Sequence, residues 1–279
     1  MIKIDKLQKK YKGFELNISM EVREGTVTGL IGKNGAGKST TIKSILGLVR
    51  PDNGSIEVLG SEPGKELASI GVALSDSGFS MMLNIKDVIR IMRASYADFE
   101  EDVFARHCKE QNLPFDKPVR EFSSGMKAKL RVLAAISHKA KLLVMDEPTT
   151  GLDVLARNEV LDLLRAYMEE DSSRSILISS HISSDLEGLC DDIYMIDRGQ
   201  IVMHEDTDTL LSQYGILKMS EKEFEELDKQ YVTVSRKDRL SVTCLTKEKQ
   251  YYIENYPNMV VENSSIDDII VLTLGGNER

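Results

Sequence analysis

A chain of 279 residues can bury a sizeable hydrophobic core, and 41% hydrophobic with 29% charged residues is typical of a globular protein. The formal net charge of −9 disfavours a nucleic-acid partner, which prefers a basic surface. No apolar run approaches the roughly 20 residues of a bilayer-spanning helix, and the charged residues 1–5 do not resemble a signal peptide. Three scattered cysteines indicate a reduced, cytoplasmic protein without a metal or disulfide framework.

The N-terminal part predicts strands followed by a phosphate-binding loop. Residues 2–31 alternate in a strand-like way, and the last of these strands leads into residues 32–40, which fit G-x-x-x-x-G-K-[ST]. Its glycines leave room for backbone N–H groups around phosphate oxygens. Lys38 can reach the β- and γ-phosphates, the Ser39 hydroxyl can bind Mg²⁺, and a helix from about Thr40 adds its positive dipole end. This loop predicts that the chain binds a nucleoside triphosphate through Gly32, Asn34, Gly35, Gly37, Lys38, Ser39 and Thr40.

The middle of the chain alternates between predicted strands and helices. Strands are expected at residues 55–59, 69–74, 142–145 and 175–179, and in a hairpin of 193–196 with 201–203. Helical patterns are expected at about 84–112, 124–138 and 153–169. The alternation predicts an α/β fold with a largely parallel sheet.

The pattern of predicted elements changes after about Tyr214. A charged helix is expected at 220–230, strand-like pieces at 231–234, 240–245 and 251–254, and a short amphipathic helix at 265–274. We therefore expect a main domain at 1–214, with a helical subdomain at about 84–135, and a small α+β accessory segment at 215–279.

A pair of acidic residues and a histidine follow the predicted central strands. Asp146 and Glu147 come directly after the apolar strand 142–145, at the sheet edge where α/β proteins hold ligands. Asp146 is expected to hold Mg²⁺, directly or through water, and Glu147 to orient the water that attacks the γ-phosphate. His181 follows strand 175–179 at the same edge and is expected to sense the γ-phosphate. The remaining histidines lack such a context and are expected to be structural: His107, His138 and His204.

A serine-rich helix start narrows the family. In Phe122-Ser123-Ser124-Gly125-Met126-Lys127, Ser123 or Ser124 can cap the helix, and the exposed amide groups form a second anion site. Shortly before the acidic strand of a phosphate-loop protein, this motif resembles the signature of the ABC ATPase family, commonly L-S-G-G-Q. The resemblance covers about residues 2–210. It implies a P-loop NTPase core with an N-terminal antiparallel β-subdomain and an inserted helical subdomain.

The resemblance also implies ligands and a partner chain. ATP with Mg²⁺ would be hydrolysed with Lys38, Glu147 and His181 as the catalytic residues. Tyr11 would stack on adenine, although an ordinary strand-edge tyrosine is the alternative. Two ATPase subunits, identical or different, would bind head to tail, with each ATP between residues 32–40 of one chain and the signature of the other. The residues expected at the second chain's side are Ser123, Ser124, Gly125 and Asp153, the last in the loop Gly151-Leu152-Asp153.

The sequence departs from the family pattern at one position. The loop after residues 70–74 usually carries a glutamine that contacts Mg²⁺ and the attacking water, and Ser75 stands there, followed by Asp76. Our hypothesis is that Ser75, helped by Asp76, reaches the metal through water and makes basal hydrolysis slow and partner-dependent. A merely variable connecting loop is the alternative.

Two short matches resemble the ATPase subunits of ABC-2-type exporters. These are Met126-Lys127 within the signature and the tail at 265–272, which is similar to the "LEDIF" ending of those subunits. The resemblance implies a separate membrane permease, an ATPase at the inner face of the cell membrane, and export of a drug, antimicrobial peptide or amphipathic peptide. A coupling helix of the permease would dock near residues 75–84, with Phe79, Met81 and Met82 as contacts or, alternatively, as core residues.

Two other classes of function remain as alternatives. A soluble ABC ATPase acting on nucleic acid or ribosomes is disfavoured by the single compact motif set and the acidic charge balance. A regulatory module on an inactive ATPase scaffold is disfavoured by the presence of Lys38, Asp146, Glu147 and His181.

Overall fold

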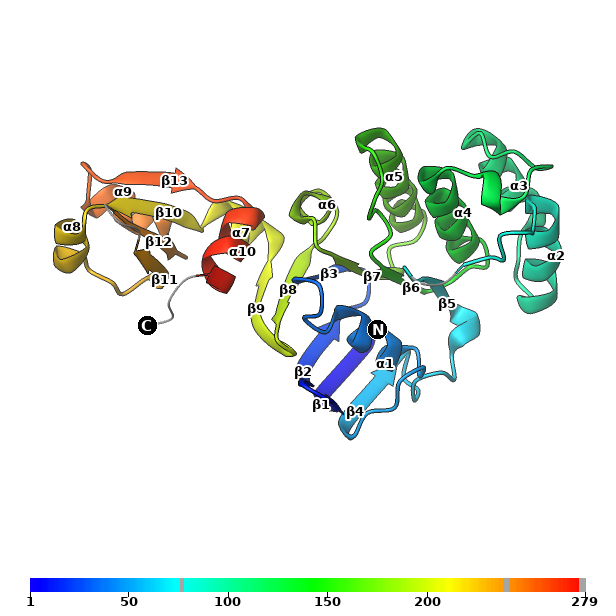
Figure 1. Ribbon diagram of the computed structural model, residues 1–279, viewed down its shortest axis with the longest axis horizontal. Helices are drawn as coiled ribbons and strands as arrows, with labels where there is room; N and C mark the ends of the chain where they lie inside the picture. The colour runs from blue at the N-terminus through cyan, green and yellow to red at the C-terminus, as the bar shows by residue number, and fades with distance from the viewer. Residues whose placement is uncertain (76–77, 238–240, 276–279) are drawn as a thin grey trace.

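The computed structural model describes residues 1–75, 78–237 and 241–275, and a six-stranded sheet lies at the centre of the molecule (Figure 1). In spatial order its strands are β5 (Ile70–Ala73), β6 (Leu142–Asp146), β7 (Ser175–Ser180), β3 (Val27–Ile31), β8 (Asp192–Asp197) and β9 (Gln200–Asp206). Neighbouring strands from β5 to β8 are parallel, and β9 forms the predicted antiparallel hairpin with β8. The predicted α/β fold is confirmed.

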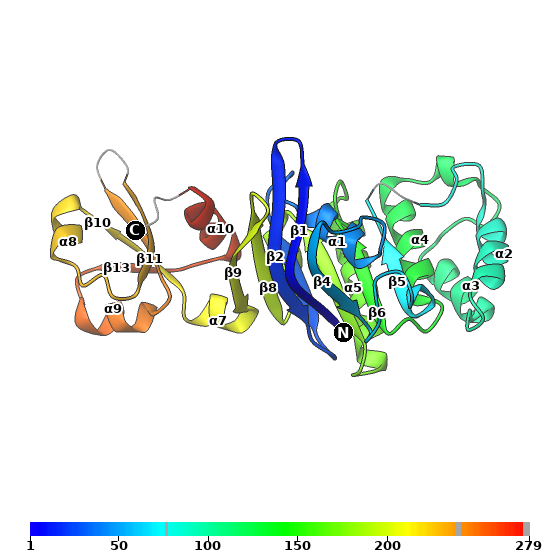
Figure 2. The same ribbon diagram turned by 90° about the horizontal axis from the view of Figure 1, so that it is seen from below.

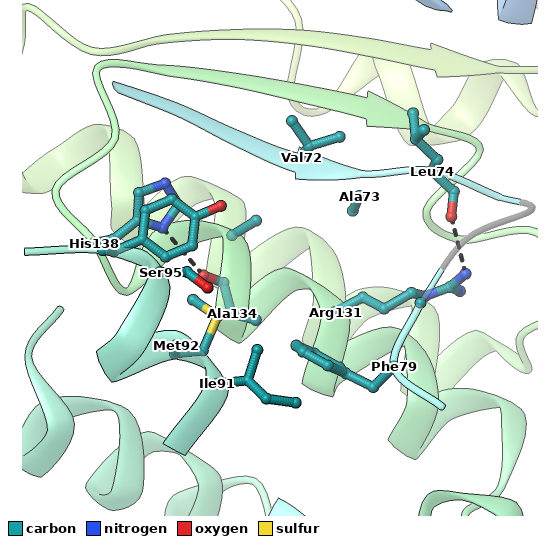
Figure 3. A pocket seen from close by; sticks show the side chains of 13 residues that line it. Val72, Ala73, Leu74, Phe79, Ile91, Met92, Ser95, Arg131, Ala134 and His138 are labelled. Atoms are coloured by element: carbon teal, nitrogen blue, oxygen red, sulfur yellow. Dashed lines mark hydrogen bonds between the residues drawn. The ribbon is translucent and has the colours of Figure 1, made fainter. Parts of the chain in front are cut away.

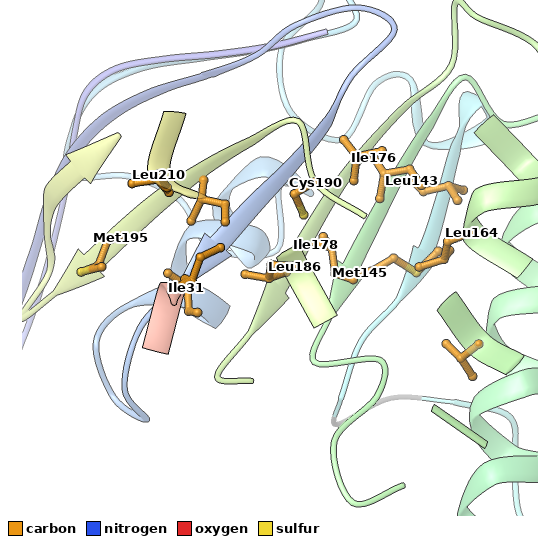
Figure 4. Packing of buried hydrophobic residues seen from close by; sticks show 14 of the residues in the cluster. Ile31, Leu143, Met145, Leu164, Ile176, Ile178, Leu186, Cys190, Met195 and Leu210 are labelled. Atoms are coloured by element: carbon orange, nitrogen blue, oxygen red, sulfur yellow. The ribbon is translucent and has the colours of Figure 1, made fainter. Parts of the chain in front are cut away.

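The central strands are apolar because both faces of the sheet are covered. Along β6, Leu143 and Met145 pack with residues of α4 (Ser124–Ile136) and α5 (Val154–Glu170) (Figure 4). The alternate residues Leu142 and Val144 face a second layer. This layer consists of α1 (Lys38–Ile45) and a three-stranded antiparallel sheet of β1 (Ile2–Tyr11), β2 (Phe14–Val22) and β4 (Asn53–Val58).

A group of helices forms one end of the elongated molecule (Figure 2). Besides α4, it contains α2 (Ile85–Ser95), α3 (Glu101–Glu110) and the short 3₁₀ turn η2 (Val119–Glu121), while η1 (Leu67–Ser69) precedes β5. The helical pattern expected over 84–112 is therefore two helices. The break begins at Tyr96, whose backbone is extended and whose ring stacks on buried His138 at 3.9 Å between centroids. Among the described residues, no helix combines the length and apolarity that crossing a bilayer requires.

The accessory segment forms the opposite end of the molecule (Figures 1 and 2). Its antiparallel sheet contains, in spatial order, β11 (Val232–Lys237), β12 (Val242–Thr246), β10 (Gly215–Met219) and β13 (Val260–Asn263). Its helices are α8 (Glu221–Glu226), α9 (Lys249–Asn255) and α10 (Ile266–Gly275), and α7 (Thr207–Ser212) leads into it. The sequence pattern did not predict β10 and β13. The strand expected at 240–245 begins at Leu240, which lies outside the described residues, and continues as β12.

One accessory prediction is wrong: residues 251–254, expected as a strand, belong to helix α9. Tyr252 is completely buried in the small accessory core, with its ring edge-on to Tyr251 at 5.1 Å. A hydrogen bond of 2.7 Å between Gln250 and Glu254, one turn apart, also favours the helix. Tertiary packing thus overrides the strand preference of the aromatic residues.

Helix α10 attaches the accessory segment to the rest of the molecule. Ile266, Ile269 and Leu272 are buried in the same hydrophobic cluster as Leu186 of α6 (Ser183–Glu187). The backbone N–H of Ile266 donates a hydrogen bond to Glu187 Oε1 at 3.0 Å. The main cluster therefore runs without interruption from the central sheet into the accessory segment.

Substitutions on two faces of α10 test this packing. Ile269→Ala should lower the free energy of unfolding by about 2–5 kcal/mol, because Ile269 is fully buried and the change leaves a cavity. Val271→Ala, on the same helix but 56% exposed, should change it by less than about 0.5 kcal/mol. Urea unfolding of both variants measures the difference, and equal losses would contradict the packing of α10 on the rest of the molecule.

Candidate functional site

A cavity of about 730 Å³ lies where the phosphate loop, residues 32–40, faces the β1–β2 hairpin. It gathers side chains and glycines from four separate parts of the chain. Its lining residues are Tyr11, Gly13, Phe14, Asn34, Gly35, Gly37, Lys38, Ser39, Thr40, Ser75 and Glu147. Most of the nucleotide-contacting residues expected from the phosphate loop thus share one cavity.

The phosphate loop connects β3 to α1 and requires glycine at two tightly packed positions. Gly37, the N-cap of α1, has φ +122°, a backbone conformation that residues other than glycine rarely adopt. A Cβ at Gly32 would lie 2.3 Å from the carbonyl oxygen of Ile196, so Gly32 is buried against β8 and does not line the cavity. Because α1 begins at Lys38, its free N–H groups and positive dipole end face the cavity.

Lys38 and Glu147 form an ion pair at the floor of the cavity. The Lys38 ammonium, only 5% exposed, donates to the Gly32 carbonyl oxygen at 2.7 Å. It also lies 3.0 Å from Glu147 Oε1, in the geometry of an ion pair rather than of a hydrogen bond. The positive charge expected to bind phosphate and the carboxylate expected to orient water are therefore in contact.

Glu147 is held by groups from three segments. Its backbone has φ +52°, and its N–H donates to the carbonyl oxygen of Ser179 at 3.2 Å. Its Oε2 accepts a hydrogen bond of 2.6 Å from Thr150 Oγ1 and lies within hydrogen-bonding distance of His181 Nδ1. Burial alone would raise the pKa of Glu147. The hydrogen bonds of Thr150 and His181, with the Lys38 ammonium, outweigh burial and hold the pKa below its ordinary value.

Asp146 provides a buried carboxylate beside the cavity. It is 1% exposed and accepts hydrogen bonds from Ser179 Oγ at 2.6 Å and from Ser75 Oγ at 3.2 Å. No cationic side chain in the described ranges forms an ion pair with it. A buried carboxylate with only hydroxyl partners is well suited to a cation, and the oxygen donors of Asp146, Ser75 and Ser39 are the kind that Mg²⁺ prefers. Asp76, expected to help Ser75, lies outside the described residues.

Tyr11 lines the mouth of the cavity at the end of β1. Its ring is 47% exposed and lies 6.4 Å from that of Phe14 across the hairpin turn. An exposed aromatic ring at the rim is available for stacking, and the role of Tyr11 as an ordinary strand-edge residue also fits this position.

The signature segment, Ser123–Gly125, and Asp153 lie apart from this cavity in the same chain. Ser123 caps α4 by accepting a hydrogen bond from the Met126 N–H at 3.2 Å, and Asp153 caps α5 through the Ala156 N–H at 2.9 Å. A Cβ on Gly125 would lie 2.7 Å from that of Ala156, so the beginnings of the two helices touch. The described residues thus form one cavity at the phosphate loop, and the exposed Ser123 and Ser124 of the signature segment lie outside it.

A second, apolar hollow lies between β5, α2 and α4 (Figure 3). We call this cavity of about 350 Å³ the docking groove, and its lining includes Phe79, Ile91 and Met92. Arg131 crosses it to donate to the carbonyl oxygen of Leu74 at 3.3 Å. Met81 and Met82 are 50% and 67% exposed, so the alternative that they are core residues is wrong.

The sequence did not predict four further residues of the site: Gly13, Phe14, Thr150 and Ser179. Thr150 donates a hydrogen bond to Glu147, and Ser179 donates one to Asp146 and accepts one from the Glu147 N–H. Phe14 lies at the rim of the cavity. Thr150 and Ser179 each stand within three residues of a predicted catalytic residue, so their hydroxyls were available as a signal. Phe14 gave none, because it alternates as any strand residue does.

Comparisons with known proteins agree with this geometry. The family model described as "ABC transporter" matches residues 16–150. The lantibiotic transport ATP-binding protein SrtF of Streptococcus pyogenes is 34% identical over 75% of this chain and 92% of its own length. The linearmycin resistance ATP-binding protein LnrL of Bacillus subtilis is 33% identical over 77% of this chain and 72% of its own. A solved ATP-binding subunit of an ABC transporter superposes with a TM-score of 0.66 and 26% identity, covering 75% of this chain and 91% of that one.

The lowered pKa of Glu147 predicts a pH-dependent contribution to stability. Because the folded carboxyl titrates below its ordinary value of 4.5, its ionised form stabilises the fold above that pH. The contribution is lost as the pH falls through the folded pKa. The difference in unfolding free energy between the parent and Glu147→Gln should therefore be largest near pH 6–7 and shrink below about pH 4.5, as measured by urea unfolding.

The exposed Glu169 provides a matched control, since Glu169→Gln removes one carboxylate from the same acidic chain. A parent-minus-Glu147→Gln difference that stays constant from pH 7 to pH 3, or grows toward acid, would contradict the contacts of Glu147.

Proposed function

This chain belongs to the ABC transporter family as an ATP-binding subunit, and we propose that it hydrolyses ATP to drive a separate membrane permease that exports an antimicrobial or amphipathic peptide or a drug. The observation that carries the proposal is that Lys38 and Glu147 contact each other in the cavity at the phosphate loop, with His181 within hydrogen-bonding distance of Glu147. The printed roles of the relatives in lantibiotic transport and linearmycin resistance favour this class of cargo.

The residues of the cavity account for the steps of hydrolysis. The N–H groups of the phosphate loop and the Lys38 ammonium bind the phosphates of ATP. Entering phosphates compete with Glu147 for Lys38, which frees the carboxylate. Glu147, kept ionised by its low pKa, accepts a hydrogen bond from the attacking water, and Thr150 and His181 hold it in place. Asp146, Ser39 and Ser75 would hold Mg²⁺, which would supply positive charge to neutralise the phosphates.

A second ATPase subunit completes the site in this proposal. Ser123–Gly125 and Asp153 do not line the cavity of their own chain, so a head-to-tail partner would bring them to its ATP. Next to Asp153, Val154 and Leu155 are 70% and 77% exposed. Exposed apolar side chains beside an anion-binding helix start are suited to an interface.

The permease is proposed to dock at the inner face of the membrane through the docking groove. The groove offers the apolar side chains of Phe79 and Ile91, with Met81 and Met82 exposed nearby. Methionine side chains adapt readily to an inserted helix. We further propose that the chain divides into an ATPase domain at 1–214 and an accessory segment at 215–279. A soluble ABC ATPase acting on nucleic acid is disfavoured by the net charge of −9.

Two variants separate binding from closure of the proposed dimer. Lys38→Ala should abolish ATP binding, because it removes the buried phosphate ligand. Ser124→Asp should leave ATP affinity within about twofold and block ATP-dependent dimerisation, since the new charge would face the partner's γ-phosphate. Nucleotide titration and light scattering, in a Glu147→Gln background that slows turnover, measure the two properties.

Ser124→Ala, which adds no charge, is the matched control and should still dimerise. Ser124 is preferable to Gly125 because any Cβ at Gly125 would also collide with Ala156 in the same chain. Dimerisation of Ser124→Asp at the parental ATP concentration would refute the head-to-tail arrangement.

Alanine substitutions near the docking groove test the permease contact. Phe79→Ala with Met82→Ala should reduce transport in cells by about tenfold or more, because the coupling contact loses two large apolar groups. ATP binding by the purified subunit should be unchanged. Val202→Ala, an exposed apolar position on β9, is the control, and full transport by the double variant would reject this docking site.

A further inference from the structure

Asp185 is a fully buried carboxylate that lies outside the cavity, four residues after His181. It belongs to α6, the short helix that follows β7. Neither its burial nor its partners are explained by ATP binding. A buried carboxylate is costly unless it is paired, so its contacts indicate what it holds.

Asp185 joins the two segments that flank Glu147 and Asp153. Its Oδ2 accepts a hydrogen bond from Thr149 Oγ1, two residues after Glu147. Its Oδ1 forms an ion pair with Arg157 Nε in the first turns of α5. Arg157 continues the link, because its backbone N–H donates to the Asp153 carbonyl oxygen at 2.9 Å and its Nη2 donates to Ser184 Oγ at 2.5 Å.

Leu186 and Glu187 of α6 contact the accessory segment. Helix α6 has five residues, too few to be stable without tertiary contacts. Leu186 is buried in the cluster that contains Ile269 of α10, and Glu187 accepts the Ile266 N–H. The backbone that carries His181 is therefore fixed by Asp185 and by α10.

We propose that Asp185 is a positioning residue for ATP hydrolysis. Through Thr149, Asp185 keeps His181 at hydrogen-bonding distance from Glu147. Through Arg157, it holds the loop of Asp153 against α6. The inference rests on the proposed hydrolysis at Glu147 and His181. The contacts of Asp185 are therefore expected to affect the rate of hydrolysis and not the affinity for ATP, which depends on the phosphate loop.

Steady-state ATPase kinetics of the full chain test this role. Asp185→Asn keeps the shape of the side chain but removes the charge opposite Arg157, so kcat should fall about 10- to 100-fold while the KM for ATP stays within about twofold. Thr149→Val replaces the hydroxyl with a methyl group and should lower kcat about three- to tenfold, whereas Thr149→Ser, which keeps the hydroxyl, should have near-parental kcat. Asp162→Asn, which breaks an exposed ion pair with Arg165 on the same α5, is the matched control and should keep parental kcat.

The outcomes separate this inference from the proposed function. Parental kcat in both Asp185→Asn and Thr149→Val would overturn the positioning role while leaving ATP hydrolysis intact. Equal loss of ATP affinity and kcat in Thr149→Val would overturn it as well, since a general structural role would move both. If Asp185→Asn fails to fold, the Thr149 pair decides. A parent chain without ATPase activity would overturn the proposed function and this inference together.

Discussion

The whole site depends on the register of three neighbouring parallel strands. Ile31 of β3 pairs with Ser180 of β7, and Asp146 of β6 pairs with Ser179 of the same strand. The phosphate loop, the acidic pair and His181 each begin within a few residues of these positions, so one register brings all three to the same edge of the sheet. A slip of one residue would turn alternate side chains to the opposite face and would separate Glu147 from Lys38.

This edge gathers opposite charges that would be costly alone. Lys38 and Glu147 are both largely buried, and each is stabilised by the other and by fixed hydrogen bonds. Asp146 differs, because the hydrogen bonds to its carboxylate from the described residues come from hydroxyl groups alone. The two carboxylates are adjacent in sequence but have different electrostatic environments, which suits one to a protein cation and water and the other to a metal ion.

Local signals made most of the site predictable, and long-range packing accounts for what was missed. The phosphate loop and the acidic pair could be predicted because strand, glycine spacing and helix follow one another within a few residues. Strand β10, which lies between β12 and β13, and the helix that contains Tyr252 could not be predicted from the sequence. Both depend on the accessory core, which distant segments form. Asp185 gave no signal either, because its importance arises from Thr149 and Arg157, which the fold brings to it.

The continuous core connects the accessory segment to the sheet edge that carries Glu147 and His181. Ile269 belongs to the same cluster as Leu186 and Ile178. Figure 4 shows Leu186 close to Ile178, which is one residue before Ser179. Closely packed cores transmit displacements because they have few voids to absorb them. Helix α10 is thus linked to His181 through the short helix α6. At the helical end of the molecule, Gly125 of α4 packs against Ala156 of α5, the helix that begins after Asp153. Both ends of the elongated chain therefore converge on the segments that flank Glu147.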